Sequence, residues 1–142
     1  MFALYANTIA TAGMVGVIWF VQVVHYPLLA QFGSTQSVGV AEQHQQRTGY
    51  VVGLPMLVEG LSTLWLLVRR PDGAAALLPW ANAVLLAVAL GSTVLVSVPL
   101  HAKMALAHND ETGRRLVLTN WPRTIAWTAR LALCGVMLAQ LS

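Results

Sequence analysis

The sequence has 142 residues, which is enough for one domain. Apolar residues make up 57% of it and charged residues only 9%, whereas about 25% of a typical soluble domain is charged. So few charges cannot cover the surface of a soluble monomer, whereas lipid tails solvate apolar side chains readily. The net charge of +3 comes from basic residues in short loops rather than in one block, so no nucleic-acid partner is expected.

Four apolar segments are expected to form helices, at about 4–29, 51–68, 77–100 and 125–141. Each is close to the ~20 residues that a helix needs to cross ~30 Å of hydrocarbon. Open strands are excluded in lipid because backbone groups must be bonded within the segment, and the apolar residues do not alternate as in a β-barrel. The sequence therefore predicts a single integral membrane domain, 1–142, folded as an all-α four-helix transmembrane bundle. The loop between the second and third helices is expected to be short, and the other two, 31–49 and 102–123, to be longer and partly helical.

The ends of the first and third segments resemble each other. The first ends in His25-Tyr26-Pro27-Leu28 and the third in Val98-Pro99-Leu100-His101. In both cases Pro-Leu precedes a polar loop and a further helix. This pattern predicts a duplicated helical hairpin, an arrangement known among membrane proteins.

Four crossings place the two longer loops on one membrane face, and both termini with the short loop on the other. Basic residues are more numerous in loops 31–49 and 102–123 than in the short loop, which holds Arg69 and Arg70. The positive-inside rule then predicts that loops 31–49 and 102–123 of a multi-pass cell-membrane protein are cytoplasmic. Tyr26, Trp80 and Trp121 are expected in the aromatic belt at the membrane interface.

Two ionisable residues lie inside the predicted membrane helices. A helix rises by ~1.5 Å per residue, and counting from the ends of the two helices at the same membrane face places Glu59 and Arg130 at similar depth. We therefore expect them to meet. Ionisable groups in lipid are costly and are functional candidates by default. Two interpretations remain open: a buried ion pair that fixes helix register, or a pair that handles protons or binds substrate.

Three histidines, His25, His44 and His101, are expected at one membrane face, near the ends of three helices. Imidazole suits iron, copper or zinc, so the three would bind a metal ion if they converge. His25 and His101 would alternatively be axial ligands of a haem. A metal-free polar pocket and histidines that merely lie at the interface also remain open, because no histidine or cysteine motif for a metal or haem is present.

Several short motifs resemble the anthrone-oxygenase-like family of small four-helix membrane proteins. They are Pro-Leu at 27–28, "VPLH" at 98–101 and "NWPRT" at 120–124, and the resemblance covers most of the chain. It implies oxygenation of a flat, reduced polycyclic or quinol-like substrate. It also implies that His25, His101, Asn120 and Arg123 line the pocket, although His101 stands where the family has asparagine.

The leading expectation is a membrane-embedded oxidoreductase or binding protein for a hydrophobic small molecule, with its pocket at the face of the longer loops. A histidine would accept a proton, Arg123 and Arg130 would stabilise an oxyanion, and Glu59 would hold Arg130 or relay a proton. The candidate catalytic residues are His25, His101, Arg123, Glu59 and Arg130. The alternative is non-catalytic: an accessory subunit of a larger membrane complex, or a homo-oligomer, packed through the small residues Ala6, Ala10, Gly13 and Gly16.

Overall fold

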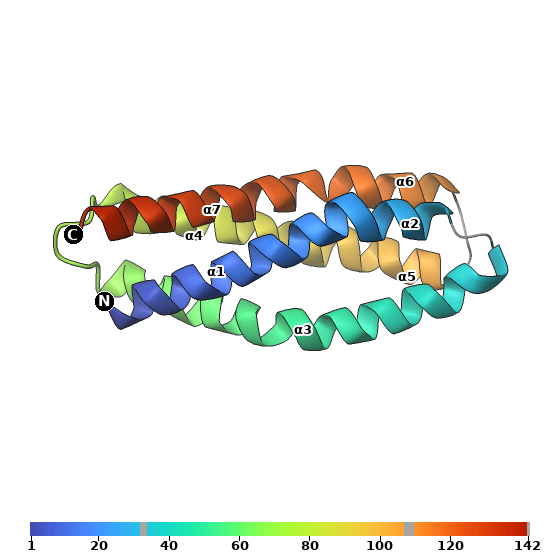
Figure 1. Cartoon of the computed structure of the whole chain (residues 1–142), viewed down its shortest axis with the longest axis horizontal. Helices are drawn as coiled ribbons and strands as arrows, with labels where there is room; N and C mark the ends of the chain where they lie inside the picture. The colour runs from blue at the N-terminus through green and yellow to red at the C-terminus, as the bar shows by residue number, and fades with distance from the viewer. Residues whose placement is uncertain (32–33, 107–109, 142) are drawn as a thin grey trace.

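A computed structural model describes residues 1–31, 34–106 and 110–141, and every regular element in these ranges is helical (Figure 1). The elements form four rods. The first consists of α1 (Phe2–Phe20), a π-helical segment η1 (Val21–His25) and α2 (Tyr26–Gln31), and the second is α3 (Ser34–Val68). The third consists of α4 (Leu77–Ser92), a π-helical segment η2 (Thr93–Ser97) and α5 (Val98–Leu106), and the fourth of α6 (Asp110–Thr119) and α7 (Trp121–Ala139).

The rods run up and down in sequence and form a closed four-membered bundle. α1 packs against α3 and α7, and α4 packs against the same two helices. Both termini lie at one end of the bundle, beside the α3–α4 loop (Figure 1). Gly73 turns this loop with a φ of 90°, and an added Cβ there would lie 3.2 Å from the backbone oxygen of Gln140. A glycine is therefore required where the loop meets the C-terminus.

Each rod buries one stripe of side chains whose spacing alternates between three and four residues. On α1 the buried residues are Leu4, Asn7, Thr11, Met14 and Ile18. On α7 the stripe includes Arg123, Trp127, Arg130, Cys134 and Met137. This spacing keeps one face of a helix toward its partners and is the packing geometry of four-helix bundles. The stripes are unusually polar for a bundle interior.

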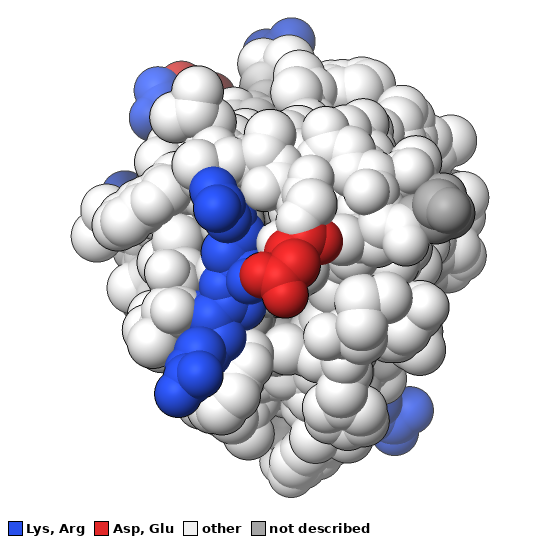
Figure 2. Space-filling model, turned by 90° about the vertical axis from the view of Figure 1, so that its left-hand side faces the viewer, with Lys and Arg blue, Asp and Glu red and all other residues white. Residues whose placement is uncertain are grey.

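Large hydrophobic side chains, such as Ile9, Leu61 and Leu95, are exposed on the outer surface of the bundle. Three segments are long and apolar enough to cross a membrane: Phe2–Leu28, Gln46–Val68 and Leu77–Lys103. At the end of the bundle that carries the termini, basic side chains lie beside an acidic one (Figure 2). Arg69, Arg70 and Asp72 of the α3–α4 loop are exposed.

The fourth rod is less apolar than the other three because its buried face carries charged residues. α7 is not among the segments that meet the criterion for a membrane span. It carries Arg123 and Arg130, and both side chains are buried inside the bundle rather than exposed on its outer face. The low hydropathy of α7 therefore reflects its inner face.

The observed helices are longer than the apolar segments at the end away from the termini. α3 begins at Ser34 rather than near 51, so most of the first long loop is helical. α6 occupies part of the second long loop. The stretch from Ser34 to Tyr50 contains no proline and several good helix formers, so nothing stops a helix there once it has begun. Apolar residues thus indicate which part of a helix can cross a membrane, but not where the helix begins and ends.

The inner face of the bundle is tested by a pair of leucine substitutions. Leu4 is fully buried and packs against Leu66, Cys134 and Met137, whereas Leu57 is 58% exposed on α3. A buried leucine truncated to alanine leaves a cavity, so Leu4→Ala should lower the free energy of unfolding in mixed micelles by ~2–5 kcal/mol. Leu57→Ala should change it by less than ~0.5 kcal/mol. Equal losses would show that the stripe on α1 is misassigned.

Candidate functional site

An ion pair between Glu59 and Arg130 lies in the interior of the bundle, and both residues are 0% exposed. The expected meeting of these two groups is therefore present, and it joins α3 to α7. The Glu59 carboxylate also accepts hydrogen bonds from the Thr11 hydroxyl at 2.8 Å and from Nε1 of Trp127 at 3.0 Å. The buried negative charge is thus compensated by three donors from α1 and α7.

The Arg130 guanidinium is held by two further acceptors. Its Nε donates to Oδ1 of Asn82 at 3.0 Å, and its Nη2 donates to the Thr63 hydroxyl at 3.2 Å. Together with Glu59 and Thr11, these contacts draw on all four rods. A buried charge is tolerated when it is paired and hydrogen-bonded, and this pair is both. The arrangement matches the interpretation of a register-fixing pair, and a catalytic role for either residue stays a prediction.

Asn7 and Cys134 extend this polar cluster toward the termini. Asn7 Nδ2 donates to the Ser62 hydroxyl at 2.8 Å and the Thr63 hydroxyl at 2.9 Å, and its Oδ1 accepts from Cys134 Sγ at 3.3 Å. Neither Asn7 nor Asn82 was singled out from the sequence. The signal that would have found them is a polar residue within an apolar run, at the same three-to-four spacing as its buried neighbours.

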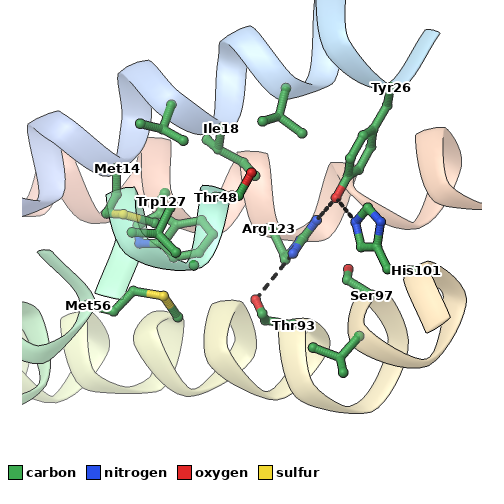
Figure 3. Close-up of a pocket in the computed structure, with 15 residues that line it drawn as sticks. Met14, Ile18, Tyr26, Thr48, Met56, Thr93, Ser97, His101, Arg123 and Trp127 are labelled. Carbon is green, nitrogen blue, oxygen red and sulfur yellow. Dashed lines mark hydrogen bonds between the residues drawn. The ribbon is translucent and has the colours of Figure 1, made fainter. Parts of the chain in front are cut away.

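A pocket of about 230 Å³ lies beside this cluster, further from the termini. All four rods contribute to its wall (Figure 3). One part of the wall is apolar and includes Met14, Ile18, Val52, Met56 and Trp127. The other part is polar and includes Tyr26, Thr93, Ser97, His101 and Arg123. Trp127 belongs to both sites, because its ring lines the pocket while its Nε1 binds Glu59.

Three polar side chains from three rods meet at the polar end of the pocket. The Tyr26 hydroxyl lies 2.8 Å from Nε2 of His101, and Arg123 Nη2 donates to the same hydroxyl at 3.1 Å (Figure 3). Arg123 Nη1 donates to the Thr93 hydroxyl at 3.3 Å. Because arginine only donates, the Tyr26 oxygen accepts from Arg123 and remains able to share a proton with His101. Such a chain of groups suits proton transfer.

A network behind the pocket fixes the position of Arg123. Its Nη2 also donates to Oδ1 of Asn120, whose Nδ2 donates to Oε1 of Gln22 at 2.8 Å. Gln22 Nε2 in turn donates to the backbone oxygen of Val117 at 3.2 Å. Asn120 is therefore a support of Arg123 rather than a residue of the pocket wall, which corrects the position that the family resemblance implied.

The two π-helical segments explain why Tyr26 and His101 face the pocket. Continued at regular spacing, the buried stripe of α1 would reach His25 after Ile18 and Val21. The extra residue that a π-helical turn contains moves the inward position on by one, so Tyr26 is 4% exposed and His25 lies at the side. In the third rod η2 has the same effect, and Ser97 and His101 are buried after Ala89.

Both π-helical segments precede a proline by the same distance. Pro27 lies two residues after η1 ends, and Pro99 lies two residues after η2 ends. Proline lacks an N–H and its ring displaces the carbonyl four residues earlier, which opens the regular ladder of hydrogen bonds. Each of Pro27 and Pro99 thus follows a π-helical turn, and the helix continues past it. Pro55 lies inside the uninterrupted α3.

The predicted histidines are not equivalent in the structure. His101 lines the pocket, whereas His25 is half-buried with its ring centroid 6.1 Å from that of Tyr26 and is not part of the wall. The side chain of His44 lies outside the described residues. Within the described part of the chain, no three His, Cys, Asp or Glu residues are grouped to bind a metal. A three-histidine site, or a haem between His25 and His101, stays a prediction.

Trp80 and Trp121 are exposed on the outer face of the bundle, and their place in an interfacial aromatic belt stays a prediction. Tyr26 is buried, which corrects its assignment, because the π-helical turn before it rotates the ring inward.

Comparison with protein-family models, with curated proteins and with solved structures gives no match. The function of the pocket is therefore argued from its own residues.

The ion pair is tested by a double-mutant cycle on Glu59→Leu and Arg130→Met. Each single substitution leaves a buried charge without its partner and should cost ~3–5 kcal/mol of unfolding free energy. The double variant removes both charges, so its loss should fall short of the sum of the single losses by at least ~2–3 kcal/mol. The measurement is denaturant unfolding in mixed micelles, and additive losses would contradict the pairing.

Proposed function

We propose that this chain is an integral membrane protein whose four rods all cross the bilayer, with both termini and the α3–α4 loop on one side. Three rods contain segments apolar enough to span, and the arginines of α7 face inward, so the bundle presents apolar side chains to lipid. The 19 residues of α7 extend over ~28 Å, close to the thickness of the hydrocarbon. The two π-helical segments before Pro27 and Pro99 support a duplicated hairpin.

The polar end of the pocket lies at one membrane face in this arrangement. Tyr26, Thr48 and His101 line this end, and each lies toward the part of its candidate span that is farther from the termini. The apolar part of the pocket extends from there toward the middle of the bilayer.

The pocket binds a small hydrophobic molecule that carries an oxygen group. The observation that supports this is the combination of an apolar wall at one end with Tyr26, His101 and Arg123 at the other. Ligand sites are typically concave and mostly apolar, with a few convergent polar groups. A volume of about 230 Å³ is small for such a site and suits a ligand of about two or three fused rings.

The polar end is suited to acid–base chemistry on the ligand. His101 accepts a proton through the Tyr26 hydroxyl, either from a ligand O–H or from a carbon next to a carbonyl. The electron pair then resides on the ligand oxygen, where Arg123 stabilises it. An enolate of this kind is the form in which anthrone-like molecules react with O₂, so oxygenase activity is the enzymatic form of this proposal. Glu59 and Arg130 contribute by holding Trp127 in the wall.

The non-catalytic alternative depended on the small residues of α1. Ala6, Ala10 and Gly13 border a shallow outer groove between α1 and α3, and a Cβ added at Gly13 or Gly16 would meet nothing within 4 Å. These residues do not bring two described helices of the chain into close contact. Their face is open to lipid or to another chain, so an accessory or oligomeric role stays a second proposal.

Ligand binding is tested by adding bulk inside and outside the pocket at adjacent positions of α3. Val52 lines the pocket and Val51 is exposed on the outer face. With 2-naphthol as probe, Val52→Phe should weaken binding to the protein in nanodiscs by at least about tenfold, since the added ring occupies ligand space. Val51→Phe adds the same bulk outside and should leave the affinity unchanged. Binding of 2-naphthol unaffected by Val52→Phe would place its site elsewhere.

Proton transfer is tested by hydrogen–deuterium exchange at the activated carbon of 2-tetralone, an enolisable two-ring ketone, followed by NMR. The reconstituted protein should accelerate exchange above the rate in empty nanodiscs. Tyr26→Phe should reduce the acceleration by ~10²-fold or more, because the ring stays and only the hydroxyl is lost. Tyr50→Phe, at an exposed position of α3, is the matched control and should not change the rate. Undiminished acceleration in Tyr26→Phe would exclude the assigned relay.

A further inference from the structure

The two buried arginines of α7 differ in how their charges are balanced. Arg130 is paired with Glu59. Arg123 is 5% exposed, yet in the described part of the chain the side-chain ion pairs are Arg130–Glu59 and Arg115–Glu111, and neither includes it. Its hydrogen-bond partners are the neutral groups of Tyr26, Thr93 and Asn120.

Neutral partners orient a guanidinium but do not cancel its charge. A cation in a low-dielectric interior is costly unless an anion compensates it, and in a membrane the cost rises with depth. The donor set of Arg123 is also incomplete, because its buried Nε has no hydrogen-bond partner in the described structure. The pocket wall thus holds one positive charge that the described residues leave uncompensated.

We propose that the ligand supplies the missing charge and is an amphipathic monoanion. One anionic oxygen group, such as a carboxylate, phenolate or enolate, binds Arg123 at the membrane face. Its apolar ring body lies along Met14, Met56 and Trp127, deeper in the bundle. This inference rests on the proposed function and names the ligand class of the same pocket.

The geometry of Arg123 is consistent with such an exchange of partners. Its bonds to Tyr26 and Thr93, at 3.1 and 3.3 Å, are longer than a charge-assisted bond to an anion, which is typically about 2.8 Å. An anionic oxygen therefore replaces weak contacts by stronger ones while Asn120 holds the guanidinium from behind. A dianion would bring one negative charge too many into the interior, so a monoanion is favoured.

The ligand class is tested with three probes that share one ring body and differ in charge: 2-naphthoate, neutral 2-naphthamide and dianionic 2-naphthyl phosphate. Binding to the full chain in nanodiscs is measured by equilibrium dialysis at pH 8, with empty nanodiscs subtracted. We expect 2-naphthoate to bind at least about tenfold more tightly than either of the other probes. Equal affinity for 2-naphthoate and 2-naphthamide would overturn the monoanion inference and leave the proposed binding function intact.

Two arginine variants identify the origin of the preference. Arg123→Met should abolish the preference for 2-naphthoate over 2-naphthamide, whereas Arg123→Lys keeps the charge and should retain part of it. Arg47→Gln, at an exposed position of α3, controls for surface charge and should not change the ratio.

The outcomes separate the two levels of the proposal. A preference that survives in Arg123→Met would overturn the inference, because the charge would then be recognised elsewhere. If Arg123→Met does not fold, the Arg123→Lys variant and the wild-type affinity ratio still decide. Failure of all three probes to bind the wild-type protein would instead contradict the proposed binding function, and the monoanion inference would fall with it.

Discussion

The ion pair between Glu59 and Arg130 is the interaction on which the rest of the structure depends. In the proposed membrane setting there is little hydrophobic driving force between helices, so packing and polar contacts decide how the rods align. This pair connects α3 to α7 across the bundle interior, and its hydrogen bonds to Thr11 and Asn82 engage the other two rods. It also binds the indole of Trp127, so the register of the bundle and one wall of the pocket are set by the same carboxylate.

Arg123, the other buried arginine of α7, makes the pocket chemically different from the ion-pair cluster. Arg123 lies on the same stripe as Arg130, seven residues earlier, but it faces a pocket and neutral partners instead of a carboxylate. One arginine thus completes a compensated structural cluster, and the other leaves a charge that a ligand can balance. The proposed function follows from this difference between the two sites, together with the Tyr26–His101 contact beside Arg123.

The sequence was sufficient to predict the helical architecture and the meeting of Glu59 and Arg130, because long apolar runs and the cost of a charge in lipid are strong constraints. It also placed His101 and Arg123 among the candidate site residues. It could not predict that Tyr26 faces inward instead of His25, because a π-helical turn shifts the register by one residue and regular spacing does not reveal it. The sequence predicted some helix in loop 31–49 but not that α3 begins at Ser34, because that stretch is polar.

The central claim is that α7 crosses the membrane with its two arginines turned inward, and sidedness measures this most directly. Single cysteines are introduced at exposed positions on either side of α7, as Arg114→Cys and Gln140→Cys, and labelled with a membrane-impermeant maleimide in oriented vesicles. The native Cys134 is fully buried and should stay unlabelled without them. We expect the two positions to be labelled from opposite sides, with Asp72→Cys on the side of Gln140→Cys. Labelling of Arg114→Cys and Gln140→Cys from the same side would contradict the account.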